Sequence, residues 1–110
     1  MNLMDAHIHI GLKQFCISQE LSFPYNLYNT YEDTISLMNQ YQVEQSVIVP
    51  IPHFQFDTKL SNTYVYEAYC KYPDRFVPFC RIDENLEKNL AQGFQGVKLH
   101  LLYESIGIKD

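Results

Sequence analysis

Four short runs of hydrophobic residues divide the sequence and predict four β-strands. Each run has the length and the apolar content typical of a strand in a globular protein. The second run, SVIVPI, is apolar at every position after its first serine, which is typical of a strand buried on both faces. The four runs occupy residues 2–10, 46–51, 76–82 and 96–101.

Each of the three segments that separate consecutive predicted strands contains a region predicted to form a helix. Thr30, followed three residues later by Asp33, predicts the start of a first helix. Asp57 predicts the start of a second helix, which Pro73 ends. A short third helix is expected from Asp83 or Asn85 to Gln92, whereas residues 12–29 show no period and predict a long loop. The second helix is expected to bury Leu60, Tyr64, Val65, Ala68, Tyr69 and Tyr72.

Strands that alternate with helices predict an α/β fold with parallel strands. Two layouts fit this order: an open, doubly wound sheet, or part of a (β/α)8 TIM barrel made of about four βα units. The first strand is followed by neither GxGxxG nor a Gly-Lys-Ser/Thr motif. A phosphate-binding nucleotide fold is therefore not supported.

The histidines gather at one kind of position, at or just past the end of a predicted strand. In parallel α/β folds the carboxyl ends of the strands form the functional site, because the loops that follow them converge there. This placement predicts a polar site at that edge of the sheet. The four histidines are His7, His9, His53 and His100.

His7 and His9 are the strongest candidates for metal ligands. In a regular strand, positions i and i+2 lie on one face, which would also carry Asp5. Two neutral imidazoles in one volume suit Zn²⁺ or another divalent metal. The simpler alternative is a pair of polar residues on a half-solvated strand.

Three further residues are candidates for a catalytic or substrate-binding role. Lys98 and His100 repeat the i, i+2 spacing on the fourth strand, although a lysine at a strand end also reaches solvent readily. Arg81 could grip a substrate carboxylate, or it could pair with Asp83 or Glu84. His53 is expected at the protein surface.

Composition and charge narrow the classes of function. The 110 residues carry a net charge of −5 and no cluster of lysine and arginine, so we expect no nucleic-acid partner. No apolar run approaches the roughly 18 residues of a membrane span. Three cysteines without a CxxC motif predict free thiols and a cytoplasmic protein.

Three segments together resemble one family of enzymes. DAHIHIG at residues 5–11 resembles the first-strand metal motif of the amidohydrolase superfamily. YPDRFVPFCRID at residues 72–83 and GFQGVKLHL at residues 93–101 resemble segments of its amidohydrolase family 2 branch. The resemblance implies the N-terminal half of a metal-dependent TIM barrel, spanning residues 1–110. HxH alone is shared with TatD-like nucleases, and the other two segments favour family 2.

The resemblance also implies an activity and a set of roles. His7 and His9 match the paired metal ligands, and Lys98 and His100 match the polar end of the fourth strand. A metal-activated water would attack a C–N or C–O bond of a small-molecule substrate, or the metal would serve a related decarboxylation with Arg81 as an anchor. The alternatives are a TatD-like metal-dependent nuclease, which the acidic charge disfavours, and a non-catalytic half-barrel.

A full barrel needs eight strands and about 250 residues, so four strands predict an incomplete unit. We therefore expect a fragment, a truncated product or a half-barrel that self-associates through its open face. Val77, Phe79 and Ile48 are expected to be exposed on that face.

Overall fold

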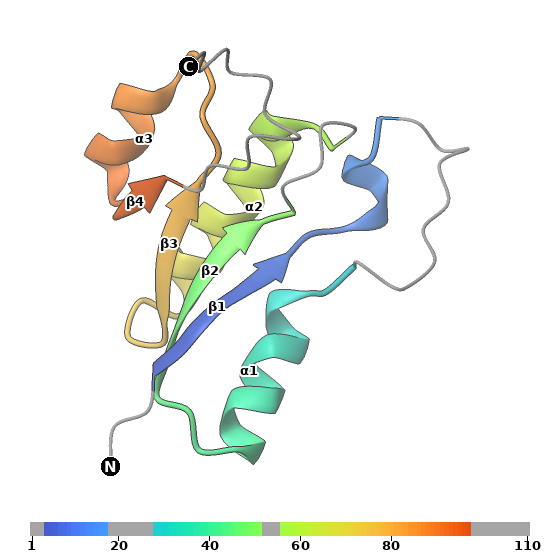
Figure 1. Ribbon diagram of the computed structural model, residues 1–110, viewed down its shortest axis with the longest axis vertical. Coiled ribbons are helices and arrows are strands. Elements are labelled where there is room, and N and C mark those ends of the chain that lie inside the picture. The colour runs from blue at the N-terminus through green and yellow to red at the C-terminus, as the bar shows by residue number, and fades with distance from the viewer. Residues whose placement is uncertain (1–3, 18–27, 52–55, 98–110) are drawn as a thin grey trace, which may run out of the picture.

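A computed structural model describes residues 4–17, 28–51 and 56–97, and it contains one sheet of four parallel strands. The strands lie side by side in chain order, from β1 to β4 (Figure 1). This order confirms the predicted parallel α/β arrangement. The strands are β1 (Met4–Ile10), β2 (Gln45–Pro50), β3 (Phe76–Cys80) and β4 (Gly96–Val97).

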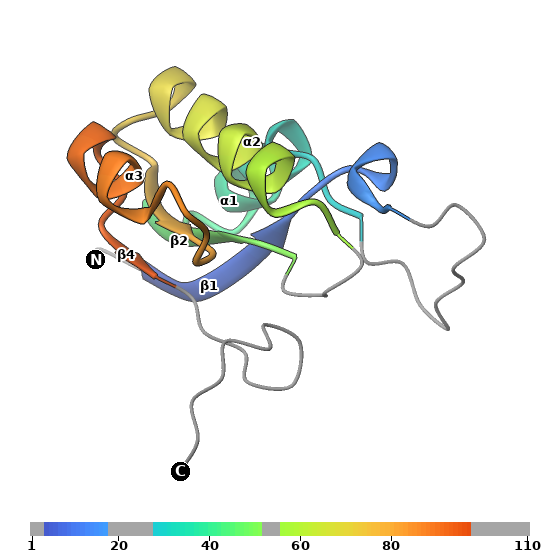
Figure 2. The same ribbon diagram turned by 90° about the horizontal axis from the view of Figure 1, so that it is seen from above.

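The three α-helices of the described residues cover one face of the sheet (Figure 2). A doubly wound sheet would carry helices on both faces, so this layout favours the half-barrel over the open sheet. None of these helices combines the length and the apolar character that crossing a membrane requires. The helices are α1 (Tyr31–Gln40), α2 (Thr58–Lys71), α3 (Leu86–Gln92) and a short 3-10 helix, η1 (Lys13–Phe15).

Side chains cap the first two long helices as the sequence predicts. The Thr30 hydroxyl accepts a hydrogen bond from the backbone N–H of Asp33, at 3.1 Å. The Asp57 carboxylate accepts one from the N–H of Leu60, at 2.9 Å. Each bond satisfies a backbone donor that the first helical turn leaves unpaired. The caps therefore fix where each crossover helix begins behind the sheet.

A hydrophobic core fills the space between the sheet and the helices. Its buried members come from β1, β2 and β3 on one side and from α1, α2 and Phe94, which follows α3, on the other. Tyr31 and Tyr64 join the two helices: their ring centroids lie 5.1 Å apart, and the Tyr31 N–H donates to the Tyr64 hydroxyl. Leu60 does not belong to this core, because 48% of its surface is exposed. The predicted burial of Leu60 is therefore wrong, and Ser61 and Asn62 are buried on that turn instead.

The pairing of β1 with β2 contains one irregularity. Asp5 is paired with Ser46 and Ile8 with Ile48, so three residue steps of β1 span two of β2. Such a bulge interrupts the regular alternation of faces along the strand. The prediction that Asp5, His7 and His9 point to one face stays a prediction, because the side chains of residues 4–7 lie outside what the structure describes.

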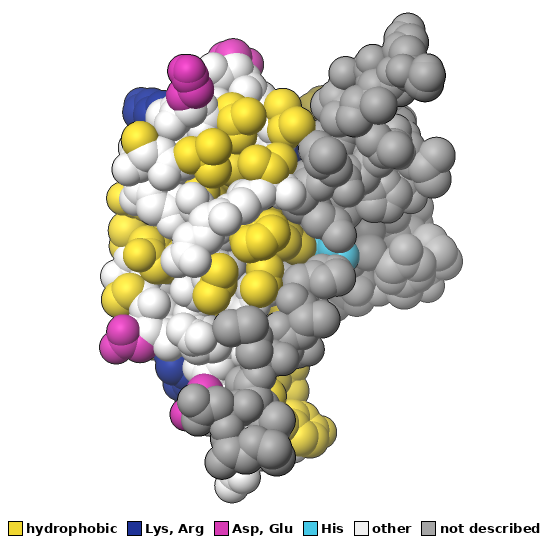
Figure 3. Space-filling model, turned by 60° about the vertical axis from the view of Figure 1, so that its left-hand side comes forward, with side chains coloured by type: hydrophobic (Ala, Val, Ile, Leu, Met, Phe, Trp, Pro, Cys, Tyr) yellow, Lys and Arg dark blue, Asp and Glu magenta, His cyan; other side chains and the backbone are white. Residues whose placement is uncertain are grey.

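The face opposite the helices carries Val77 and Phe79 of β3 and His9 of β1. Ile48 is fully buried on the helix side, where it contributes to the core, so its predicted exposure on the open face is wrong. Val77 and Phe79 alternate with the core residues of β3 and are half-buried. A Cβ atom at Gly96 would come within 2.6 Å of the Phe79 ring, so only glycine allows the ring to lie against β4. When the side of the molecule with α3 and β4 is turned forward, hydrophobic side chains gather in the middle of its surface (Figure 3).

Candidate functional site at the carboxyl ends of the strands

The loop after β1 returns to the strand end from which it starts. Gly11 and Asn29 exchange two backbone hydrogen bonds, of 2.9 and 3.0 Å. The Asn29 side chain adds two more, to the carbonyl of His9 at 3.2 Å and to the Thr34 hydroxyl at 2.9 Å. Asn29 therefore fixes the end of β1, and with it the His9 backbone, against the first turn of α1.

A second junction joins this loop to the loop after β2. The Asp57 N–H donates to the carbonyl of Phe15, at 2.8 Å, and Cys16 and Phe56 form an isolated antiparallel bridge. Cys16, Ile51 and Phe56 are buried together in a small hydrophobic cluster. The first two loops are thus held as one unit over the strand ends.

Arg81 connects the end of β3 to the same unit. Its guanidinium is almost completely buried, and Nη1 donates to the carbonyl of Phe56 at 3.1 Å and to that of Ile51 at 3.5 Å. Hydrogen bonds to charged donors are among the stronger ones in proteins. The structure therefore gives Arg81 a role in holding the loop after β2, and its role as a substrate anchor stays a prediction.

Asn62 of α2 holds the backbone of Arg81 from the other side. The Arg81 N–H donates to Asn62 Oδ1 at 2.8 Å, and Asn62 Nδ2 donates to the Arg81 carbonyl at 3.1 Å. Asn62 Nδ2 also lies 3.5 Å from Asp83 Oδ2, and Asp83 Oδ1 accepts from the Asn85 N–H at 2.9 Å. Asp83 is therefore a local acceptor that supports the start of α3.

His9 lies near the carboxyl end of β1. It follows Ile8 and precedes Ile10, which both pack into the helix-side core, so the His9 side chain faces the opposite side of the sheet. That face is the interior of a barrel, and His9 is half-buried there near the strand end. The backbone of His7 belongs to the same strand, and its side chain lies outside what the structure describes.

Several predicted site residues lie outside the described residues. They are His53, Lys98 and His100. Within the described ranges, no three histidine, cysteine, aspartate or glutamate side chains come close enough to hold a metal ion. A catalytic zinc site usually needs three protein ligands. The described residues alone supply fewer.

Cys80 is structural rather than nucleophilic. None of the three cysteines forms a disulfide; Cys16 and Cys80 are buried, and Cys70 is exposed. Burial raises the pKa of the Cys80 thiol to about 11, and the nearby charge of Asp83 acts in the same direction. Because the thiolate is the reactive form, Cys80 is inert at neutral pH.

Two of the residues that organise this edge were not predicted from the sequence. Asn29 and Asn62 lie 20 and 19 residues from their backbone partners, so no local pattern reveals them. One signal was present: Asn62 lies three residues before Val65, which the sequence predicted to be buried on the same face of the helix. A buried asparagine needs hydrogen-bond partners, and here they are the two backbone groups of Arg81.

Solved structures confirm the fold as part of a TIM barrel. A probable 2-pyrone-4,6-dicarboxylic acid hydrolase from Acinetobacter baumannii, with citric acid bound, superposes with a TM-score of 0.69 at 24% identity over 90% of this chain. A 2,6-dihydroxybenzoate decarboxylase complexed with 2,6-dihydroxybenzoate superposes with a TM-score of 0.61 at 18% identity over 88% of this chain. The matched region spans 38% of the length of each of these two chains. Neither a protein-family model nor a curated protein matches the sequence.

Proposed function

We propose that this chain supplies the first half of a metal-dependent hydrolase or decarboxylase barrel of the amidohydrolase family 2 type. The observation that carries the proposal is the HxH motif at the end of β1, with His9 half-buried on the sheet face that has no helices. The two similar solved structures support it, because they are named as a hydrolase and a decarboxylase. These are the two activities that the sequence resemblance implies.

In this proposal His7 and His9 bind Zn²⁺ or another divalent metal. A bound metal of this kind polarises a carbonyl or lowers the pKa of a water molecule. The chain itself contributes a fixed position for the ligands. Asn29 bonds the His9 carbonyl, and the Gly11–Asn29 pair closes the loop that follows, so the end of β1 is held before any ligand binds.

Lys98, His100 and Arg81 are the proposed contributors to substrate binding or catalysis. The substrate would be a small molecule. Free thiols agree with a reducing compartment, and we place the protein in the cytoplasm.

The proposed site needs more metal ligands than the described residues bring together. A second copy of the chain, or further chain, would complete it against the open face formed partly by Val77 and Phe79. Without that completion, the four βα units would form a non-catalytic half-barrel. We therefore expect the chain alone to bind zinc weakly and to hydrolyse no simple ester or amide.

Calorimetric titration of the 110-residue chain with zinc tests the proposal. The His7→Ala and His9→Ala variants should each lose the weak binding. Cys70→Ser is the matched control, because it removes an exposed thiol that could bind zinc adventitiously, and it should bind as the parent does. Unchanged binding in both histidine variants would refute the ligand assignment. Tight stoichiometric binding by the parent would refute the view that the site is incomplete.

A further inference from the structure

A series of side-chain hydrogen bonds connects the start of α1 to the end of β1. Asn29 Nδ2 donates to the Thr34 hydroxyl at 2.9 Å and to the His9 carbonyl at 3.2 Å. The Thr34 hydroxyl donates to the carbonyl of Thr30, the N-cap of α1, at 3.0 Å. The backbone of His9 is therefore tied through two side chains to the first turn of α1.

The donors and acceptors in this series match one another. The amide nitrogen of asparagine carries two hydrogens, and Asn29 directs one to each of its two acceptors. A hydroxyl has one hydrogen and a carbonyl can only accept, so the Thr34 hydroxyl donates to Thr30 and accepts from Asn29. Valine, which has almost the same shape as threonine, could form neither bond.

Thr34 is held firmly enough to serve as a support. Its side chain is 1% exposed, so water does not compete for the hydroxyl. The N–H of Tyr31, in the same turn, donates to the Tyr64 hydroxyl of α2 at 3.1 Å. The first turn of α1 is therefore fixed to α2, and the series of bonds ends on a packed pair of helices.

The residues that follow His9 are fixed independently by packing. Ile10 is fully buried in the hydrophobic core. A Cβ atom at Gly11 would come within 2.8 Å of the Ile51 side chain, so the backbone itself packs there. These contacts fix the chain after His9, and the Asn29 amide fixes the His9 carbonyl. Because the allowed side-chain rotamers depend on the backbone conformation, this strand end limits the orientations open to the His9 imidazole.

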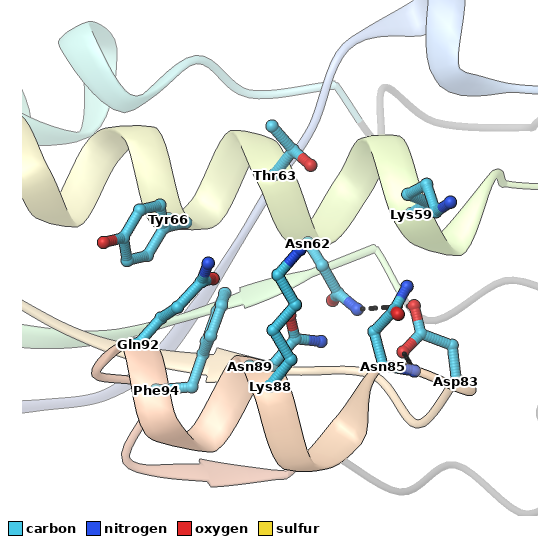
Figure 4. A pocket seen from close by; sticks show the side chains of 10 residues that line it. All are labelled: Lys59, Asn62, Thr63, Tyr66, Asp83, Asn85, Lys88, Asn89, Gln92 and Phe94. Atoms are coloured by element: carbon cyan, nitrogen blue, oxygen red, sulfur yellow. Dashed lines mark hydrogen bonds between the residues drawn. The ribbon is translucent and has the colours of Figure 1, made fainter.

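The end of β3 is supported in the same way. Asn62 of α2 bonds the N–H and the carbonyl of Arg81 and also reaches Asp83 (Figure 4). At both strand ends, an asparagine outside the sheet binds the backbone of a residue that the sequence singles out for the site. This repetition indicates that side-chain amides hold this edge of the sheet in shape.

We propose that Asn29 and Thr34 are positioning residues for His9. This inference rests on the proposed function, in which His9 is a metal ligand. Both residues act through His9: Asn29 holds the His9 backbone, and Thr34 holds the Asn29 amide. A ligand that already has its binding orientation loses little freedom when the metal binds, so contacts that support it raise the metal affinity.

NMR couplings of the ¹³C,¹⁵N-labelled chain test the proposal without any metal. Three-bond couplings from the backbone to Cγ report the χ1 rotamer of His9, and the parent should show one predominant rotamer. In Thr34→Val and Asn29→Ala the couplings should become averages over two or more rotamers. Ser36→Ala and Asn39→Ala are matched controls, because both residues are exposed on α1, and they should keep the couplings of the parent. One predominant rotamer in both Thr34→Val and Asn29→Ala would overturn the proposal.

Thr34→Ser separates positioning from a general loss of stability. It keeps the hydroxyl and removes one buried methyl group, so it should destabilise the chain to urea and still keep the His9 couplings of the parent. All variants are compared at a temperature at which circular dichroism shows each of them to be fully folded. If Thr34→Ser changed the couplings as much as Thr34→Val does, the hydroxyl would not be the cause and the proposal would fail.

Zinc titration followed at the Gly11 amide gives a second readout. Asn29→Ala should weaken zinc binding about tenfold, the low end of what lost supporting contacts cost at metal sites, and Thr34→Val by a smaller factor. Because Thr34 acts through Asn29, the double variant should bind no more weakly than Asn29→Ala. Losses that simply add would overturn the role of Thr34. If the parent bound no zinc through His9, the proposed function would fail, whereas the rotamer comparison would still decide the positioning.

Discussion

Replacement of Asn62 by alanine should destabilise the chain strongly. Asn62 is 3% exposed, and it bonds both the N–H and the carbonyl of Arg81. The methyl group of alanine cannot form these hydrogen bonds to the Arg81 backbone. The loss would free the end of β3 from α2 and disturb the guanidinium contacts to Ile51 and Phe56.

The expected loss follows from the two hydrogen bonds. A buried donor left without a partner costs about 1–3 kcal/mol, and the weakened carbonyl adds about 1 kcal/mol more. The sum is about 2–4 kcal/mol, a large part of the roughly 5–15 kcal/mol that stabilises a typical domain. For a domain of about this size, the melting temperature should fall by roughly 10–25 °C.

Urea unfolding monitored by circular dichroism measures this free energy. Thr63→Ala is the matched control, because Thr63 is exposed on the same helix and should change the stability by less than about 0.5 kcal/mol. Asn62→Asp is a second variant: it keeps an acceptor for the Arg81 N–H but puts a negative charge beside Asp83. It should be unstable at neutral pH and regain stability as the pH falls. If Asn62→Ala lost no more stability than Thr63→Ala, the proposed bracing of Arg81 would be wrong.

Three further predictions use the cysteines and one glycine. In the folded chain at pH 8, iodoacetamide should modify exposed Cys70 and spare Cys80, as mass spectrometry would show; equal labelling would contradict the burial of Cys80. The pKa of Cys80 rises from 9.0 to about 11 on folding, so its contribution to stability is complete below pH 9 and is lost as the pH rises toward 11. The urea midpoint should fall over that interval, and it should fall less in Cys80→Ala. Gly96→Ala should lose about 1–3 kcal/mol, because its Cβ would clash with the Phe79 ring, whereas Gln95→Ala should stay near the parent.

Helix boundaries were predicted correctly where they depend on contacts between residues that are close in the sequence. Thr30 and Asp57 are caps whose bonds reach only three residues along the chain, so their sequence positions were enough to locate α1 and α2. Pro73 ends the second helix region as expected, with α2 stopping at Lys71. The parallel order of the strands followed from the alternation with helices.

It was harder to predict which strand residues face the helices and which distant residues contact one another. β2 is apolar on both faces, so its pattern contains no sign of which residues face the helices, and Ile48 was assigned to the wrong face. The bulge in β1 depends on its pairing with β2, which local periodicity does not record. Asn29, Asn62 and the guanidinium contacts of Arg81 join segments that are 19 to 30 residues apart, so they appear only in the folded chain.

The proposed metal position is tested most directly by adding Co²⁺ to the ¹⁵N-labelled chain and recording paramagnetic broadening of its backbone amides. The broadening should be strongest around His9 and Gly11, at the carboxyl end of β1, and weak at Gln45 and Phe76 at the opposite ends of β2 and β3. It should disappear in His9→Ala. Broadening that is centred on the acidic residues around Asp83, or that persists in His9→Ala, would contradict a metal site built on the first strand.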